Sequence, residues 1–379
     1  MTKLALVTGG AGFVGSHLVD ALVAEGTNVR VLDNLLLQAH PTGKARFLSP
    51  GAELLIGDLR DRPTVDRALA GAELVFHLGG LVGNGQSMYD VQRYVDHNSV
   101  GTAVLIEAML ARRVQFSRLV VASSMVVYGD GAYDCIEHGR AHRVRRPIER
   151  LSQSIWEPLC SRCDRTVTPT ATSEEHPLAP TSTYAISKRD QEELALVLGR
   201  THDLPTVALR FLNVYGSRQA LGNPYTGVAA VIANRILHGK APIIFEDGAQ
   251  RRDFTHVSDV VAANLLAARA PAEAHYEAFN VGTGRSVTIL DLAQRIATGL
   301  GRTQKVVPSG GFRAGDIRHC FADVKKAQRL LGFTAKTTLE QGMSELLGWA
   351  TGERTEDKSD EATAELAQRK LIRWVGEQR

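Results

Sequence analysis

The sequence predicts an α/β fold in which a doubly wound parallel sheet carries a smaller second α/β lobe. Two observations support this prediction. Short apolar runs alternate with longer segments of 3.6-residue periodicity, and glycines crowd the turn that follows the first apolar run. Repeated strand and helix units of this kind form parallel sheets with right-handed crossovers.

Six segments are predicted as strands because they are short, apolar and rich in β-branched residues: Leu4–Val7, Val29–Leu32, Glu53–Ile56, Leu74–His77, Leu119–Ala122 and Thr206–Arg210. Four segments between them carry the helical period: Gly15–Glu25, Arg62–Ala70, Val95–Arg113 and Thr183–Arg200. The alternation becomes irregular after about residue 213, as is typical of a smaller lobe that closes over a ligand.

These patterns divide the chain into residues 1–212, a second lobe of residues 213–350, and a helical tail of residues 351–379. Part of the second span, about 255–285, is expected to return to the first lobe. Residues 130–182 show little periodicity and are interpreted as an insertion. In the tail, Ala367, Leu371, Trp374 and Val375 form a helical stripe that we expect to pack on its own protein or on another subunit.

The charge balance and the lack of long apolar runs exclude some classes of protein. The chain has 379 residues, with 44 Lys+Arg against 41 Asp+Glu, so a nucleic-acid partner is not expected. Five arginines in the insertion are interpreted as a solvated face or a subunit contact: Arg140, Arg143, Arg145, Arg146 and Arg150. Without a long apolar run or a cleavable leader, the sequence predicts a cytoplasmic protein that does not enter a membrane.

The glycine-rich turn predicts a dinucleotide site. Gly9, Gly12 and Gly15 are spaced Gly-x-x-Gly-x-x-Gly before a helix, where a pyrophosphate can lie against the helix N-terminus. Asp33 ends the second strand, 18 residues past Gly15; its carboxylate suits a ribose 2′-hydroxyl and repels a 2′-phosphate, which favours NAD. The other expected cofactor contacts are Phe13, Val14, Asn34, Asp58, Leu59, Leu78 and Gly79.

Three residues predict acid–base chemistry. Tyr184 and Lys188 are one helical turn apart, and Ser124 follows the fifth strand at the ligand-binding edge of the sheet. A phenol is a poor base at neutral pH, but a nearby ammonium and an oxidised nicotinamide stabilise its phenolate. Ser124 would hydrogen-bond the reacting oxygen.

These motifs, together with Asn98 and the segment from Arg210 to Gly216, resemble the extended short-chain dehydrogenase/reductase family of nucleotide-sugar epimerases and dehydratases. The resemblance covers roughly residues 3–350. It implies a Rossmann-type sheet with a substrate-binding lobe, Ser124, Tyr184 and Lys188 as catalytic residues, and Asn98 as a residue that holds the cofactor and the active-site helix. It also implies a homodimer formed through the helices of residues 95–113 and 183–200.

The resemblance further implies a nucleotide-diphosphate sugar as substrate. Arg252, Arg313, Asp316 and Asn213 match positions that contact the diphosphate and the nucleoside ribose, which suits the forked guanidinium of arginine. Gln86, Ser87 and Tyr225 are chosen as sugar contacts. Four longer stretches, at 85–90, 219–230, 245–254 and 313–323, look like the bacterial subgroup that includes dTDP-L-rhamnose 4-epimerase.

The resemblance to this family also predicts the type of reaction. Dehydratases of this family carry an Asp-Glu pair after the catalytic hydroxyl residue, whereas this chain has Met125 and Val126. We therefore expect a 4-epimerase with tightly bound NAD that oxidises C4, lets the keto sugar rotate and reduces it again. The alternatives are epimerisation at another carbon or on another sugar, a 4-keto-sugar reductase, and a non-catalytic NAD-binding regulator.

Two short-spaced pairs in the insertion predict a metal site. Cys135-x-x-His138 and Cys160-x-x-Cys163 are separated by 21 residues, which suits a tetrahedral structural zinc that staples a loop without a core. The alternative is three reduced thiols and a surface histidine. The resembling subgroup carries paired cysteines here, so His138 departs from it. Cys320 is expected to be a buried thiol.

Overall fold

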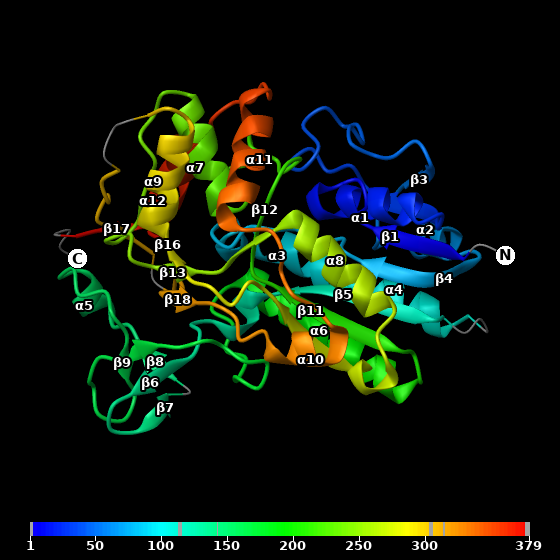
Figure 1. Ribbon diagram of the computed structural model, residues 1–379, viewed down its shortest axis with the longest axis horizontal. Coiled ribbons are helices and arrows are strands. Elements are labelled where there is room, and N and C mark those ends of the chain that lie inside the picture. Colours follow the sequence, from blue (N-terminus) through cyan, green and yellow to red (C-terminus); the bar gives the residue numbers. More distant parts are fainter. Residues whose placement is uncertain (1–2, 113–115, 142, 303–305, 314, 376–379) are drawn as a thin grey trace.

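The computed structural model describes residues 3–112, 116–141, 143–302, 306–313 and 315–375 (Figure 1). Its centre is a parallel sheet of seven strands in the order β15-β11-β5-β4-β1-β2-β3, which confirms the predicted fold class. The strands are β1 (Leu4–Thr8), β2 (Asn28–Asp33), β3 (Ala52–Ile56), β4 (Ala72–His77), β5 (Arg118–Ser124), β11 (Thr206–Phe211) and β15 (Glu277–Val281). All six predicted strands are present.

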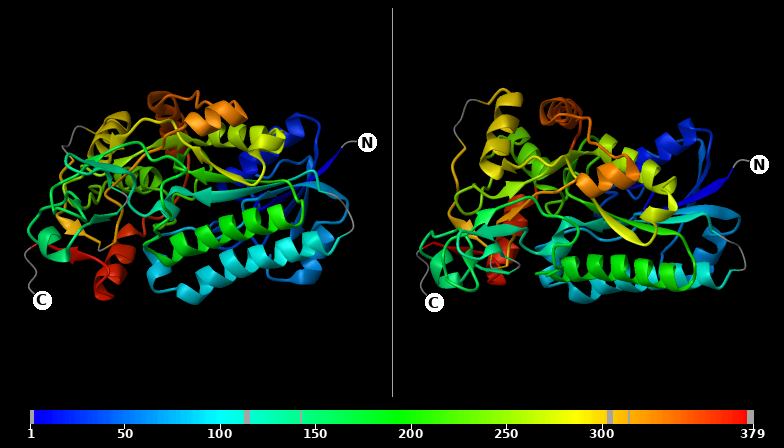
Figure 2. Two further views of the ribbon diagram at one scale, coloured as in Figure 1. Left: turned by 90° about the horizontal axis from the view of Figure 1, so that it is seen from below. Right: turned by 60° about the horizontal axis from the view of Figure 1, so that its bottom comes forward.

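Helices cover both faces of this sheet (Figure 2). One layer holds α2 (Arg62–Ala68), α4 (Gly101–Leu110) and α6 (Thr183–Thr201); the other holds α1 (Phe13–Ala24), α8 (Val257–Ala268) and α10 (Lys325–Leu331). In β1, Leu6 packs into the first layer and Val7 into the second. Because both faces are buried there, β1 and β5 at the middle of the sheet contain the continuous apolar runs Leu4–Val7 and Leu119–Ala122.

The predicted helix of residues 95–113 differs from a regular α-helix. It consists of a π-helical segment η2 (Val95–Val100) and α4 (Gly101–Leu110), and the short helix α3 (Val91–Tyr94) precedes it; Arg113 lies outside the described residues. A π-helical turn is rare and is often found at functional sites. Here it contains Asn98. Short 3-10 helices lie at η1 (Gln86–Met88), η3 (Met125–Tyr128) and η4 (Ala272–Ala274).

The second lobe packs three helices, α7 (Val228–Leu237), α9 (Ile289–Gly299) and α11 (Leu339–Thr351), around the buried side chains of Ile232, Leu292 and Leu346. Its small sheets pair β12 (Asn213–Tyr215) with β14 (Phe254–His256), and β13 (Arg251–Arg252) with β16 (Val287–Thr288) and β18 (His319–Cys320). Between these segments, α8 and β15 pack on the first lobe.

The insertion has a small core, contrary to the expected coreless loop. Its strands are β6 (Tyr133–Cys135), β7 (Gly139–Ala141), β8 (Val144–Arg145), β9 (Leu159–Cys160) and β10 (Thr168–Pro169), with helix α5 (Ile148–Leu151). Tyr133 and Val167 are buried together with two of the cysteines. These elements form a separate lobe at the lower left of Figure 1.

Arg146 is not on a solvated face, which corrects the expectation for the arginine cluster. Its side chain is only 7% exposed, and it donates to the Glu246 carboxylate at 2.5 Å and to the Asp316 carbonyl at 2.9 Å. The fully buried Arg318 binds the second Glu246 oxygen at 2.8 Å. Buried charges of this kind are paired because an isolated charge is costly, so this network fastens the insertion to the second lobe.

The tail also differs from the continuous helical stripe expected. Helix α12 (Ser359–Gln368) ends before Lys370, which has a left-handed φ of +59°, and β19 (Arg373–Trp374) then pairs antiparallel with β17 (Gly311–Phe312). Trp374 is therefore a strand residue, and residues 376–379 of the predicted tail lie outside the described part of the chain. Within the described ranges, no helix has the length and hydropathy needed to cross a bilayer.

Candidate active site

A cleft of about 1740 Å³ runs between the carboxyl ends of the sheet strands and the second lobe. Open α/β sheets bind ligands at this edge. Of the residues predicted to contact a cofactor or substrate, all line the cleft except Asn98 and Ser87. Its volume exceeds that of a typical single-ligand pocket, which suits two ligands side by side.

The glycine turn lies at one end of this cleft and leaves no room for a side chain at Gly9 or Gly15. A Cβ on Gly15 would lie 2.2 Å from the Gly9 carbonyl oxygen, and one on Gly9, whose φ is +66°, would lie 2.8 Å from the backbone of Gly79. Gly12 precedes α1, and Phe13 and Val14 form its first turn. The arrangement brings the open N-terminus of a helix to the cleft, where a pyrophosphate fits.

Two carboxylates that could accept hydrogen bonds from the adenosine half of NAD lie beside the glycine turn. The buried Asp33 carboxylate accepts hydrogen bonds from the backbone N–H groups of Ala11, at 3.1 Å, and Leu35, at 2.9 Å. Asn34 donates to Asp58 at 3.2 Å, and hydrogen bonds from Arg60 hold the pKa of Asp58 well below its usual range. Both carboxylates are thus fixed in place, which fits the ribose and adenine of NAD.

The catalytic candidates meet across the cleft from two elements. Ser124 ends β5, and Tyr184 and Lys188 face the cleft from α6. Burial raises the pKa of Tyr184 to about 12, and the nearby Ser124 hydroxyl offsets part of this rise. Burial lowers the pKa of Lys188 to about 7. Its Nζ donates to the Ala122 carbonyl and, at 2.7 Å, to Gln191.

Ser87 is placed behind Tyr184 rather than in the cleft, which corrects its choice as a sugar contact. Its side chain is completely buried, accepts from the Tyr184 N–H at 3.0 Å and donates to the Asn84 carbonyl at 2.7 Å. Both hydrogen-bonding roles are therefore used within the protein. Ser87 holds the start of α6, which the Ser182 side chain caps by accepting from the Ala185 N–H.

Asn98 is also buried and does not line the cleft. It lies where the loop after β4 meets α6. Its Oδ1 accepts from the Leu81 N–H at 2.7 Å, and its Nδ2 donates to Ser187 of α6 at 2.9 Å. Leu81 belongs to the loop after β4 that includes Leu78 and Gly79. Asn98 thereby ties the loop after β4 to α6.

The second lobe places polar groups opposite this centre. Arg252 is held by the carbonyl groups of Ile317, at 2.5 Å, and Arg318, at 3.0 Å. Arg313 pairs with Asp316 at 2.8 Å, and its guanidinium lies 4.9 Å from the centre of the Phe245 ring. Asn213 also lines the cleft, and among the described residues its buried Oδ1 has no hydrogen-bond partner.

Several lining residues were not anticipated from the sequence. Phe245 and Gln250 also line the cleft. Both belong to the stretch 245–254 that resembles the family, and their nearness in sequence to Arg252 could have indicated them. Ala362 and Leu366 reach the cleft from α12. The apolar stripe predicted in the tail indicates a packed helix there. It does not indicate which part of the protein this helix covers.

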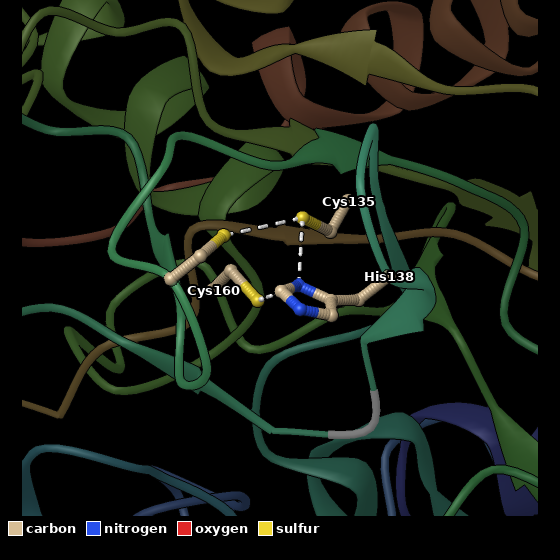
Figure 3. Close-up of side chains that lie close together, drawn as sticks. Cys135, His138 and Cys160 are labelled. Atoms are coloured by element: carbon tan, nitrogen blue, oxygen red, sulfur yellow. Dashed lines mark hydrogen bonds between the residues drawn. The ribbon is translucent and has the colours of Figure 1, made fainter.

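The four predicted metal ligands lie together, and Figure 3 shows Cys135, His138 and Cys160 converging. The Cys135 sulfur is 3.6 Å from both His138 Nδ1 and the Cys163 sulfur, and the Cys160 sulfur is 3.7 Å from the same nitrogen. Zinc bonds of about 2.3 Å to sulfur and about 2.0 Å to nitrogen separate tetrahedral ligands by roughly 3.5 to 3.8 Å. The donor set therefore fits zinc.

The model of the NAD dependent epimerase/dehydratase family matches residues 5–149 and 161–282, which is more than half of the chain. The chain belongs to this family. It is similar to a dTDP-L-rhamnose 4-epimerase from Burkholderia thailandensis, with 33% identity over 93% of this chain and 96% of that protein. Family membership makes it an NAD-dependent enzyme of the nucleotide-sugar epimerase/dehydratase class.

Solved structures of other family members have the same fold. A UDP-glucose 4-epimerase from Thermotoga maritima, solved with UDP-glucose, has 30% identity and a TM-score of 0.74 over 92% of this chain and 98% of its own. A UDP-glucose 4-epimerase from Thermus thermophilus, solved with NAD, has 29% identity and a TM-score of 0.74 over 93% of this chain and 100% of its own.

Proposed function

We propose that this family member is an NAD-dependent nucleotide-sugar 4-epimerase whose substrate is dTDP-L-rhamnose or a related nucleotide hexose. The observation that carries this proposal is the set of groups at the reacting centre. Ser124, Tyr184 and Lys188 supply what a reversible oxidation needs, and the two residues after Ser124 supply no proton-transfer group. The likeness to the Burkholderia epimerase supports the choice of sugar.

In this mechanism, Tyr184 takes the proton of the C4 hydroxyl, and Ser124 holds the same oxygen by a hydrogen bond. When held by the glycine turn and Asp33, NAD would supply reversible hydride chemistry at C4. Arg252 and Arg313 would hold the diphosphate about which the oxidised sugar turns to present its opposite face. Tyr184 then returns its proton to the new hydroxyl.

Met125 and Val126 support epimerisation over dehydration. Met125 is buried in an apolar cluster with Tyr128 and Leu212, and Val126 packs against that cluster. Elimination of water needs an additional acid and base beside the sugar, and neither side chain carries a transferable proton. The same machinery acting at another carbon or on another sugar, and a 4-keto-sugar reductase, are the competing proposals.

The test is to incubate the purified protein, without added NAD(P)H, with dTDP-, UDP- and GDP-hexoses that include dTDP-L-rhamnose, and to follow products by NMR. A sugar inverted at C4 with no net consumption of cofactor is the expected result. Inversion at another carbon would support the first competing proposal. Conversion only with stoichiometric oxidation of NADPH would identify a reductase and contradict the role given to Asp33.

We also propose that Cys135, His138, Cys160 and Cys163 hold a structural zinc ion. With all four residues as ligands, no open coordination position would be left for catalysis. Two of the cysteines are buried in the small core of the insertion, and a tetrahedral ion there joins the β6–β7 turn to the segment after β9. A homodimer through α4 and α6, and a cytoplasmic location, stay predictions.

Metal analysis of protein purified without chelators should give one zinc ion per chain. Cys163→Ser should lose this zinc and lower the melting temperature by several degrees, because metal-binding energy in such sites is folding energy. Cys320→Ser is the control for zinc content, because the buried Cys320 lies outside the cluster. Full zinc content in the Cys163 variant would contradict the ligand assignment.

A further inference from the structure

The insertion of residues 130–182 lies against one short segment of the second lobe, residues 315–319, whose last residue begins β18 (Figure 1). The same segment also reaches the cleft, where Asp316 and Ile317 belong to the lining. The proposed mechanism uses two arginines of this lobe and gives the insertion no part. The segment is therefore a physical link between the insertion and the cleft.

Both arginines that the mechanism assigns to the diphosphate are held by this segment. Arg252 donates to the carbonyl of Ile317 at 2.5 Å and to the carbonyl of Arg318 at 3.0 Å. Arg313 donates to Oδ2 of Asp316, from Nε at 3.1 Å and from Nη2 at 2.8 Å. The position of the segment therefore determines where both guanidinium groups lie.

The backbone of the segment is held in turn by side chains of the insertion. Nη1 of Arg146 donates to the Asp316 carbonyl at 2.9 Å, and the Arg318 N–H donates to Oδ1 of Asp130 at 2.7 Å. Nε of Arg146 donates to the Trp156 carbonyl at 3.1 Å. Because a guanidinium is planar and rigid, a second anchor within the insertion fixes the direction in which Arg146 reaches Asp316.

Glu157 adds contacts to the side chains of the segment. Its Oε1 accepts from Nε and Nη2 of Arg318 at 3.0 and 2.6 Å, and its Oε2 lies 2.9 Å from Nε2 of His319. The His319 N–H donates to the Tyr133 hydroxyl at 3.1 Å. Arg146 directly follows β8 and Glu157 precedes β9, and these strands pair antiparallel, so both residues lie at the ends of one loop.

We infer that the insertion is a positioning element for nucleotide-diphosphate binding, in which Arg146 and Glu157 hold residues 315–319 so that Arg252 and Arg313 reach the diphosphate. This inference rests on the proposed binding of a nucleotide-diphosphate sugar. Arg146 and Glu157 are not among the residues that line the cleft, so they act only through the arginines. An arginine fork grips two phosphate oxygens only from a suitable position, and a small displacement of a binding group is costly.

The test measures the binding of dTDP and of UDP to the NAD-loaded protein by calorimetry. Arg146→Met should weaken nucleotide binding about tenfold, the loss expected for one charge-assisted hydrogen bond. It should raise KM for the sugar nucleotide by a similar factor and leave kcat little changed. Glu157→Gln should weaken binding less, roughly threefold, because glutamine keeps an acceptor for Arg318. The NAD content of both variants should equal that of wild type, since the glycine turn lies in the first lobe.

Hydrogen exchange without nucleotide provides a second readout. Two backbone amides of residues 315–319 donate to side chains of the insertion, so Arg146→Met should increase exchange in this segment. Arg145→Met is the matched control. Arg145 is the preceding residue of the chain, its side chain is 52% exposed, and it pairs with Asp164 within the insertion. This variant should match wild type in nucleotide affinity and in exchange.

Unchanged nucleotide affinity in both Arg146→Met and Glu157→Gln would overturn the inference. If Arg146→Met also loses NAD, its fold is damaged, and the affinity of Glu157→Gln then decides. Failure of wild type to bind either nucleotide would instead contradict the proposed function. In that case exchange in the segment that stays at the wild-type level in both variants would overturn the positioning role as well.

Discussion

Tyr184→Phe is expected to lower turnover by about a thousandfold, within the range that general acid–base groups contribute, while the protein keeps its fold and its NAD. The phenol is the only group in the proposed mechanism that takes the C4 proton. Phenylalanine preserves the ring contact with Tyr94 and removes only the hydroxyl. Turnover should be measured by NMR, and NAD content by absorbance after denaturation.

Tyr276→Phe serves as the control because Tyr276 lies outside the cleft lining. Unchanged turnover in Tyr184→Phe would contradict the proposed mechanism. The pH profile adds a second readout. Since the phenolate is the active form and the pKa of Tyr184 is about 12 in the protein alone, kcat/KM should rise with pH on the acid side.

Glu192→Gln is expected to reduce the free energy of unfolding by about 3 kcal/mol, the lower end of the cost of breaking a buried ion pair. Glu192 is 2% exposed and accepts from Arg210 at 2.5 and 3.0 Å and from Ser123 at 2.6 Å. When Glu192 is replaced by neutral glutamine, the positive charge of the buried Arg210 guanidinium loses its partner charge. Urea unfolding at a fixed NAD concentration provides the measurement.

The adjacent Glu193 provides the control. It pairs with Arg189 on the exposed surface of α6, where the two side chains are 49% and 40% exposed. Glu193→Gln should change the free energy of unfolding by less than about 0.5 kcal/mol. Equal unfolding midpoints for the two variants would contradict the importance assigned to the buried pair.

The central sheet and one end of the cleft could be predicted because their signals are local. A strand buried on both faces is a continuous apolar run, and Gly9 and Gly15 are required because a Cβ there would lie under 3 Å from neighbouring backbone. The pairing of β19 with β17 joins residues some 60 positions apart. The apolar stripe of the tail therefore predicts a helix at Trp374, where the structure has a strand. The burial of Ser87 likewise depends on the position of α6, which sequence spacing does not contain.

The path of the chain between the lobes limits how this enzyme can be recombined with its relatives. After β11 the backbone enters the second lobe through β12, comes back for α8 and β15, and leaves again for β16. A chimera with a single crossover near residue 212 would therefore import a foreign edge strand for the sheet as well as a foreign second lobe. Exchanging the second lobe alone requires two discontinuous segments to be transplanted together, with β15 kept from the host.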